Sequence, residues 1–274
     1  MGSRLATCSA AACAAALALA GVAGAGTVFV DDAAAILYYD ASPGETNVLT
    51  LTEEPNGMRV VDAGAPVVEE TVGGPPFCTV ASAHELDCAL PAGFRSLEVD
   101  LFDGNDAATV VGALPAGIHG GDGDDVLTGG GGTDVLDGAE GNDTLRGRAA
   151  VGVGAADEGY PTRQVLTAGD GADVLTGGGG RDDVYGGGGA DTLRGYGGRD
   201  TLDGGGGRDI LFGGRRGDVL RGGGWRDTAY GGRGPDVFWM RDGVRDVIRG
   251  GRGSDEAQVD RRLDVSAGVE LFFY

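Results

Sequence analysis

The sequence predicts an all-β protein in which a short glycine-rich unit repeats along a solenoid. Glycine accounts for 57 of the 274 residues, against a usual share of about 7%. From residue 120 onward a nine-residue unit recurs, with aspartate at its sixth position and an apolar residue at its eighth. The three residues around that apolar position are β-prone. Each unit is therefore expected to form a six-residue glycine-rich turn followed by a three-residue strand.

The charge balance narrows the possible functions. The chain has 42 acidic residues and 21 basic ones, all arginine, which gives a net charge of −21. This acidity argues against nucleic acid or an anionic membrane as the main partner. So much glycine leaves few side chains for the core of a conventional globular enzyme. Two possibilities remain: disorder, or a repeat held together by something other than apolar burial, for which a bound cation is the obvious counter-charge.

Residues 1–25 are expected to be a secretory signal peptide. Arg4 precedes an apolar stretch rich in alanine and leucine, and Ala23-Gly24-Ala25 fits a small-residue cleavage site. The mature protein is then secreted. In that oxidising setting the two remaining cysteines, Cys78 and Cys88, are expected to form a disulfide, with two free thiols as the alternative.

Residues 26–118 lack the regular nine-residue repeat, and their pattern predicts a small β-rich N-terminal region. Short β-prone runs are separated by turn signals such as Pro55-Asn56-Gly57. Asp103-Gly104-Asn105-Asp106 already resembles a turn of the later repeat. A start of the solenoid before Gly120 is therefore compatible with the sequence. The predicted strands cover Thr27–Val30, Ile36–Tyr39, Val48–Thr52, Met58–Val61, Thr79–Ala81 and Leu97–Phe102.

The solenoid itself is predicted over 119–258. An irregular stretch, 147–167, interrupts it and is expected to form a loop, and 259–274 is expected to be a C-terminal cap. In every unit the sixth residue is aspartate. The eighth-position residues are expected to stack as an apolar spine: Leu127, Leu136, Leu145, Leu175, Val184, Leu193, Leu202, Leu211, Leu220, Ala229 and Phe238.

The pattern G-G-x-G-x-D-x-U-x, with U apolar, resembles the RTX or haemolysin-type calcium-binding nonapeptide family. The resemblance covers about half of the chain, 120–258. It implies a right-handed parallel β-roll in which two units form one winding. It also implies that Ca²⁺ lies between the turns of successive windings, bound by the sixth-position carboxylates and by glycine carbonyls. An oxygen-rich donor set of this kind suits Ca²⁺ better than Mg²⁺.

The resemblance also assigns metal ligands. They are Asp125, Asp134, Asp143, Asp173, Asp182, Asp191, Asp200, Asp209, Asp218 and Asp236. Arg216 replaces the fourth-position glycine in the unit of Asp218, which puts that ligand in doubt. Asp227, Asp246 and Asp255 are in doubt because their own or their partner units are degenerate. If each ion needs a pair of turns two units apart, the repeat region holds at most about seven ions.

The energetics favour folding coupled to calcium. One apolar side chain per unit does not offset the cost of ordering a glycine-rich chain. Stacked carboxylates add repulsion. Without cations the repeat region is therefore expected to be poorly folded, and calcium binding is expected to supply folding free energy.

Arginines fill many variable positions, at position five in units such as that of Arg181 and at position nine in those of Arg146, Arg194 and Arg221. Their simplest role is to balance surface charge. The alternative is a binding stripe for an anionic cell-surface or matrix polymer.

Enzymatic signals are weak. The chain has two histidines, and neither H-E-x-x-H nor G-x-S-x-G is present. Ser82-Ala83-His84-Glu85 contains the residue types of a catalytic triad, but neighbours in one strand cannot adopt triad geometry. The sequence therefore favours a non-enzymatic structural or adhesive extracellular module. The alternative is an exported hydrolase, or hydrolase accessory, with its site in 26–118.

Overall fold

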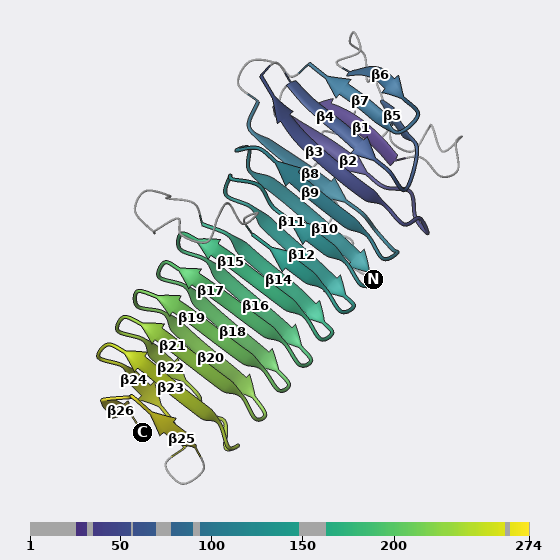
Figure 1. Cartoon of the computed structure of the whole chain (residues 1–274). Coiled ribbons are helices and arrows are strands. Elements are labelled where there is room, and N and C mark those ends of the chain that lie inside the picture. The colour runs from purple at the N-terminus through teal and green to yellow at the C-terminus, as the bar shows by residue number, and fades with distance from the viewer. Residues whose placement is uncertain are drawn as a thin grey trace.

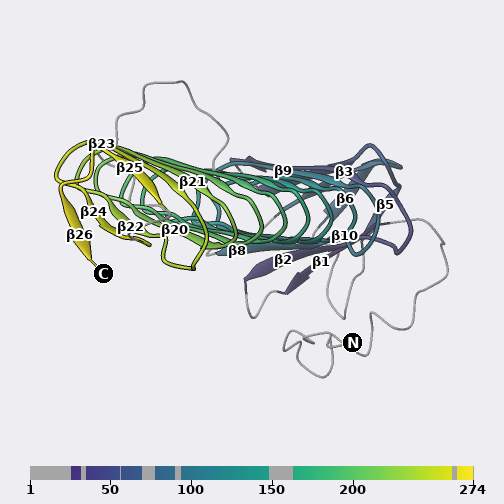
Figure 2. The same ribbon diagram turned by 90° about the horizontal axis from the view of Figure 1, so that it is seen from below.

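The computed structural model describes residues 26–31, 35–55, 57–69, 78–89, 94–147, 163–260 and 264–273. The expected signal peptide lies outside these ranges. The chain winds between two 13-stranded sheets, and the windings stack along one axis (Figure 1). Seen from below, the turns close a flattened tube, with the N-terminal strands at one end and β26 at the other (Figure 2).

Sheet A has the strand order β26-β24-β22-β20-β18-β16-β14-β12-β10-β8-β2-β1-β5, and sheet B has the order β25-β23-β21-β19-β17-β15-β13-β11-β9-β3-β4-β7-β6. The N-terminal strands are β1 (Gly26–Asp31), β2 (Ile36–Asp40), β3 (Val48–Glu54), β4 (Gly57–Asp62), β5 (Val67–Glu69), β6 (Cys78–Ser82) and β7 (Glu85–Cys88). The remaining strands are β8 (Ser96–Asp100), β9 (Ala107–Val111), β10 (Ala116–Asp122), β11 (Val126–Thr128), β12 (Val135–Glu140), β13 (Thr144–Arg146), β14 (Val165–Asp170), β15 (Val174–Gly179), β16 (Asp183–Gly188), β17 (Thr192–Gly197), β18 (Thr201–Gly206), β19 (Ile210–Arg215), β20 (Val219–Gly224), β21 (Thr228–Arg233), β22 (Val237–Trp239), β23 (Val247–Arg252), β24 (Glu256–Gln258), β25 (Val265–Ala267) and β26 (Leu271–Phe273).

The repeat strands pair in parallel, and each pairs with the strand two units away. Leu193 of β17 lies opposite Leu211 of β19, and Leu202 of β18 lies opposite Leu220 of β20. Two units therefore make one winding, and consecutive units alternate between the two sheets. This is the parallel β-solenoid of a β-roll, so the predicted fold class is confirmed.

The apolar core lies between the sheets. Every eighth-position residue predicted for the spine is fully buried. The two sheets contribute facing columns, with Leu175, Leu193 and Leu211 in one and Val184, Leu202 and Leu220 in the other.

Most repeat strands are longer than the repeat pattern predicts, whereas β11, β13, β22 and β24 have the expected three residues. In β17, Thr192–Gly197, the ladder continues past the apolar residue, and Tyr196 pairs with Gly214 of the next winding. In the six-residue strands the expected division of each unit into a six-residue turn and a three-residue strand is therefore wrong. The first three positions extend the strand, because glycines without side chains allow neighbouring windings to approach closely enough to pair.

Parallel windings begin before the glycine-rich repeats. β2 pairs with β8 and β3 pairs with β9, while β9 pairs with β11 of the repeat region. Antiparallel strands β1, β4, β7 and β6 then extend the two sheets at this end. All six predicted N-terminal strands correspond to strands of the structure, whereas β5, β7, β9 and β10 were not predicted.

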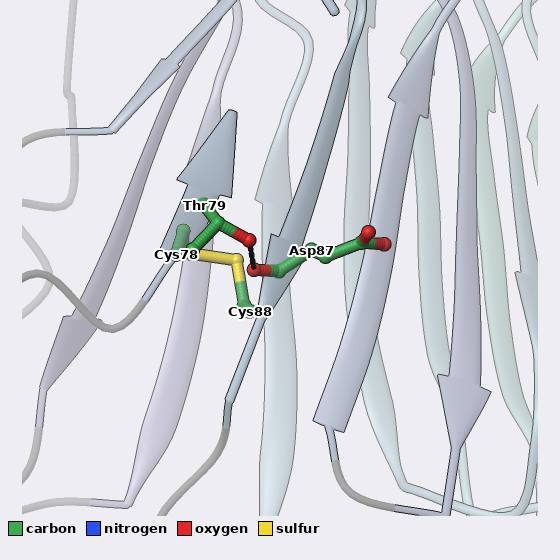
Figure 3. The surroundings of a disulfide bond; sticks show 4 residues. All are labelled: Cys78, Thr79, Asp87 and Cys88. Atoms are coloured by element: carbon green, nitrogen blue, oxygen red, sulfur yellow. Dashed lines mark hydrogen bonds between the residues drawn. A yellow bond between two sulfur atoms is a disulfide. The ribbon is translucent and has the colours of Figure 1, made fainter. Parts of the chain in front are cut away.

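A disulfide joins Cys78 of β6 to Cys88 at the end of β7 (Figure 3). The two residues are also directly paired across the strands. Thr79 Oγ1 donates to the Asp87 carbonyl in the same hairpin, at 3.3 Å. The bond therefore closes the outer hairpin of sheet B.

The expected interruption at 147–167 falls mostly on residues 148–162, outside the described part of the chain. β14 begins at Val165 and pairs with β12 and β16. Its preceding residue, Gln164, occupies the place that the sixth-position aspartate has in other units.

Candidate metal centre

The turns form two columns, one along each edge of the solenoid. Each sixth-position aspartate directly precedes a strand, at the point where the turn re-enters a sheet. All the repeat aspartates at this position are at most 1% exposed. Buried carboxylates are costly unless they are paired or bound to a metal.

One carboxylate oxygen of each aspartate has a regular partner. The Asp191 amide donates to Asp209 Oδ1 at 2.9 Å, and the Asp209 amide donates to Asp227 Oδ1 at the same distance. On the other edge, Asp182 donates in the same way to Asp200, again at 2.9 Å. These hydrogen bonds tie each turn to the turn one winding further on.

The other oxygen, Oδ2, is buried without a hydrogen-bond partner at most of these positions. These unpaired oxygens recur along both edges of the solenoid, so they are a regular feature of the repeat. A buried carboxylate oxygen of this kind is stabilised by a bound cation or by a proton. The unpaired oxygens belong to Asp106, Asp125, Asp134, Asp143, Asp173, Asp182, Asp191, Asp209, Asp227, Asp236 and Asp255.

Backbone oxygens lie beside these carboxylates. A Cβ atom built on Gly186 would collide with Asp191 Oδ2 and would lie 2.7 Å from the Gly204 carbonyl oxygen of the next winding. The first-position glycine thus leaves room where oxygens of two windings approach one another. Among the described residues, no three His, Cys, Asp or Glu side chains lie close enough together to hold a metal. Carbonyls must therefore complete any site, and this donor set fits the hard cation Ca²⁺.

The turn geometry tolerates the replaced glycines. Fourth-position residues have positive φ angles, as at Gly207 with 133° and Gly189 with 137°. Arg216 and Trp225 occupy the same place with φ of 76° and 87°. They therefore carry the backbone strain of a left-handed residue with a Cβ while keeping the turn.

The four aspartates in doubt share the common geometry. Asp218, Asp227, Asp246 and Asp255 are buried like the others. Each accepts a hydrogen bond through Oδ1 from the amide one winding earlier: Asp218 from Asp200, Asp227 from Asp209, Asp246 from Asp227 and Asp255 from Asp236. Degenerate sequence in these units has not removed the turn.

Two further aspartates belong to the columns. Asp106 is 2% exposed, and its amide donates to Asp125 Oδ1 at 2.9 Å. Asp264 Oδ1 accepts from the Asp246 amide at 2.9 Å. The Asp103–Asp106 stretch already signalled the first of these. Nothing in the sequence around Asp264 matches the repeat.

Burial raises the pKa of eight column carboxyls with particular force. It is the largest cause at each of these eight, and neighbouring carboxylates add to it at Asp125, Asp173 and Asp227. The pKa is about 8 for Asp182, about 7 for Asp125, Asp173, Asp227, Asp236 and Asp246, and about 6 for Asp134 and Asp209. Raised pKa values mean that these carboxyls take up protons more readily than a free aspartate does, whereas a bound cation would stabilise their charged form.

Other acidic turn residues have different surroundings. Asp124 is exposed, and its Oδ1 accepts from the Asn142 amide at 2.8 Å and from Nδ2 at 3.0 Å. These bonds lower its pKa. Asp124 therefore links turns at the surface and does not resemble the buried column.

The histidines show no triad geometry. His84 lies in the turn between β6 and β7, rather than within a strand as expected, because the hairpin reverses after Ser82. Its Nδ1 lies 3.0 Å from the Asp62 carbonyl oxygen and 2.9 Å from that of Ala65. His119 Nδ1 lies 3.5 Å from Asp137 Oδ2 on the outside of sheet A, and this contact raises its pKa.

These features define a β-solenoid repeat protein with oxygen-donor sites along its turns. The model of the RTX calcium-binding nonapeptide repeat matches the chain in four copies, over residues 118–145, 159–193, 185–220 and 212–244. The repeat region belongs to this family, and its repeats are calcium-binding repeats. The search of curated proteins found no match. The described residues contain no helix long and apolar enough to cross a membrane.

Proposed function

We propose that this protein is a secreted calcium-binding module whose β-roll folds when it binds Ca²⁺. The observation that supports the proposal is the pair of edge columns, in which buried carboxylate oxygens face carbonyls and have no hydrogen-bond donor. Bound Ca²⁺ supplies the positive charge that stabilises these carboxylates together.

The chain's own residues prepare the sites. The Oδ1 hydrogen bonds fix each carboxylate and leave Oδ2 for the ion. First-position glycines keep the space beside it open. We propose as ligands the ten aspartates assigned from the sequence, together with Asp106, Asp227, Asp246 and Asp255. The expected bound of about seven ions already counted the pair of turns that contain Asp209 and Asp227, but it left out the pairs that contain Asp106, Asp246 or Asp255.

The setting is proposed to be extracellular. Support comes from the signal-like segment 1–25 and from the Cys78–Cys88 disulfide, which suits an oxidising compartment. Millimolar Ca²⁺ outside cells would fold a chain that stays unfolded where calcium is scarce. The role that fits a solenoid of this kind is a structural or adhesive one.

The test is a count of bound ions. Equilibrium dialysis of residues 26–274 against Ca²⁺ is expected to show several ions per chain, displaced poorly by Mg²⁺. Binding of one ion or none at millimolar Ca²⁺ would refute the proposal.

A further inference from the structure

The two sheets carry different charge. Nine successive strands of sheet B, β9 to β25, contain no Asp or Glu. Sheet A strands of the same windings carry several acids on their outer face, including Asp137, Asp203 and Glu256. The chain has a net charge of −21, and yet the strands β9 to β25 of sheet B contribute no acidic side chain to the outer face of this sheet.

A stripe of arginines lies on this face at the ends of three neighbouring strands. Arg215 of β19 lies opposite Arg233 of β21, which lies opposite Arg252 of β23. All three are exposed, and none forms an ion pair with any described residue. Like charges placed directly opposite in neighbouring strands repel. The stripe is therefore an unsatisfied line of positive charge along the solenoid axis.

A second row of side chains, made of two aromatic rings and two arginines, lies beside the arginine stripe on the strands β17 to β23. The rings of Phe212 and Tyr230 stack with centroids 4.9 Å apart and planes 6° apart. The Arg194 guanidinium lies 5.3 Å from the Phe212 ring centroid, and that of Arg249 lies 5.8 Å from that of Tyr230. The aromatic pair holds these two arginines in place at its ends, one on β17 and one on β23.

We propose that the outer face of sheet B from β17 to β23 binds a linear anionic polysaccharide that runs along the solenoid axis. Strands are spaced by roughly 4.8 Å, so the stripe presents one charge per short, regular step, which suits a chain with one negative charge on each sugar. A membrane surface is a poorer match, because these charges form a line and do not surround a bulky apolar patch. The inference rests on the proposed function in one respect, since calcium would neutralise the acidic edges beside the face.

The experiment measures binding of residues 26–274 to immobilised chondroitin sulfate, in millimolar Ca²⁺ and low salt, with neutral dextran as the blank. The test variant is Arg215→Gln/Arg233→Gln/Arg252→Gln. The matched control, Arg208→Gln/Arg226→Gln/Arg245→Gln, makes the same charge change in turns of the opposite edge. Circular dichroism in Ca²⁺ checks that both variants are folded.

We expect the wild-type chain to bind, with binding weakened by salt. The sheet B variant should bind roughly tenfold more weakly, since each exposed ionic contact contributes a few-fold, and the control variant should bind as the wild type does. Folded protein that does not bind, or equal losses in both variants, would overturn the inference. So would binding to phosphatidylglycerol vesicles without binding to the polysaccharide. A chain that neither binds Ca²⁺ nor folds would instead refute the proposed function.

Discussion

At the scale of single residues, the sixth-position aspartate combines two roles in one side chain. Its Oδ1 accepts a backbone hydrogen bond that sets the stacking of the turns, as between Asp191 and Asp209. Its Oδ2 is buried without a donor. A neutral isostere can keep the first role, but it supplies a weaker metal ligand and no charge.

Asp191→Asn should therefore weaken calcium-coupled folding while leaving the turn intact. We expect a loss of about 1–3 kcal/mol in the free energy of unfolding in Ca²⁺, the range for interactions of charged groups. Asp203→Asn makes the same charge change on the outer face of sheet A and should cost under about 0.5 kcal/mol. Urea unfolding in fixed Ca²⁺ measures both, and equal effects would contradict the assigned role.

The raised pKa values predict an unusual pH dependence for the calcium-free chain. Eight of the column carboxyls, those of Asp125, Asp134, Asp173, Asp182, Asp209, Asp227, Asp236 and Asp246, have a pKa of about 6 to about 8 when folded, against about 3.9 in an unfolded chain. The folded form then holds protons that the unfolded form has lost, so the stability is present at low pH and declines as the pH rises through 6 to 8.

In chelator we therefore expect more β-structure by circular dichroism at pH 4.5 than at pH 8. Calcium should show the reverse trend, with a lower folding midpoint at pH 8, because protons compete for the same oxygens. A calcium-free chain that gains structure as the pH rises would contradict the burial of these groups.

At the scale of the element, the glycine positions of one turn are not equivalent. The first position faces the carboxylate, as Gly186 faces Asp191 Oδ2. The fourth position has a positive φ. Some third positions are open, and a Cβ at Gly179 would meet nothing within 4 Å.

Gly186→Ala should destabilise the calcium-loaded roll by about 2 kcal/mol or more, because its methyl group would displace the carboxylate or a backbone carbonyl. Gly179→Ala, in an equivalent strand, should be neutral or stabilising by up to about 1 kcal/mol. Thermal melts in Ca²⁺ compare the two directly. A similar loss for both would mean that glycine serves only chain flexibility.

Trp225→Gly is expected to stabilise the roll by about 1 kcal/mol. Trp225 is exposed and has a φ of 87°, a conformation that costs a residue with a Cβ roughly 1–2 kcal/mol. The Trp225 backbone N–H donates a hydrogen bond to Asp242 Oδ2, and a glycine at this position would keep it. Trp225→Ala separates the two effects, since it removes the ring and keeps the strain. If alanine stabilised as much as glycine, the ring and not the backbone would be responsible.

At the scale of the whole molecule, most of the repeat architecture could be predicted from the phase of two positions. The recurring aspartate and apolar residue predicted the turns, the spine and the two columns of aspartates. The first windings were harder to recognise, because Leu101 occupies the place of a first-position glycine: it follows Asp100, the partner of His119, as Gly120 follows His119. Among the glycines and the aspartate of the pattern, only the fourth-position Gly104 and the sixth-position Asp106 remain in this unit. The full strand length was also missed, because pairing between glycines leaves no apolar pattern in the sequence.

The charge separation between the faces also follows from the sequence, but only once the winding is known. Consecutive units alternate between sheets, so the acids of one unit and the arginines of the next lie on opposite faces. In the linear sequence, Asp203 and Phe212 occupy the same ninth position of two consecutive units. In three dimensions they lie in sheet A and sheet B respectively.

The central claim is that calcium supplies the free energy that folds the solenoid. The most direct measurement is a Ca²⁺ titration of residues 26–274 followed by circular dichroism at neutral pH, with Mg²⁺ in parallel. A cooperative transition from coil to β-structure near millimolar Ca²⁺, absent with Mg²⁺, is the predicted result. A chain that is fully β-structured in chelator, or still unfolded in excess Ca²⁺, would contradict it.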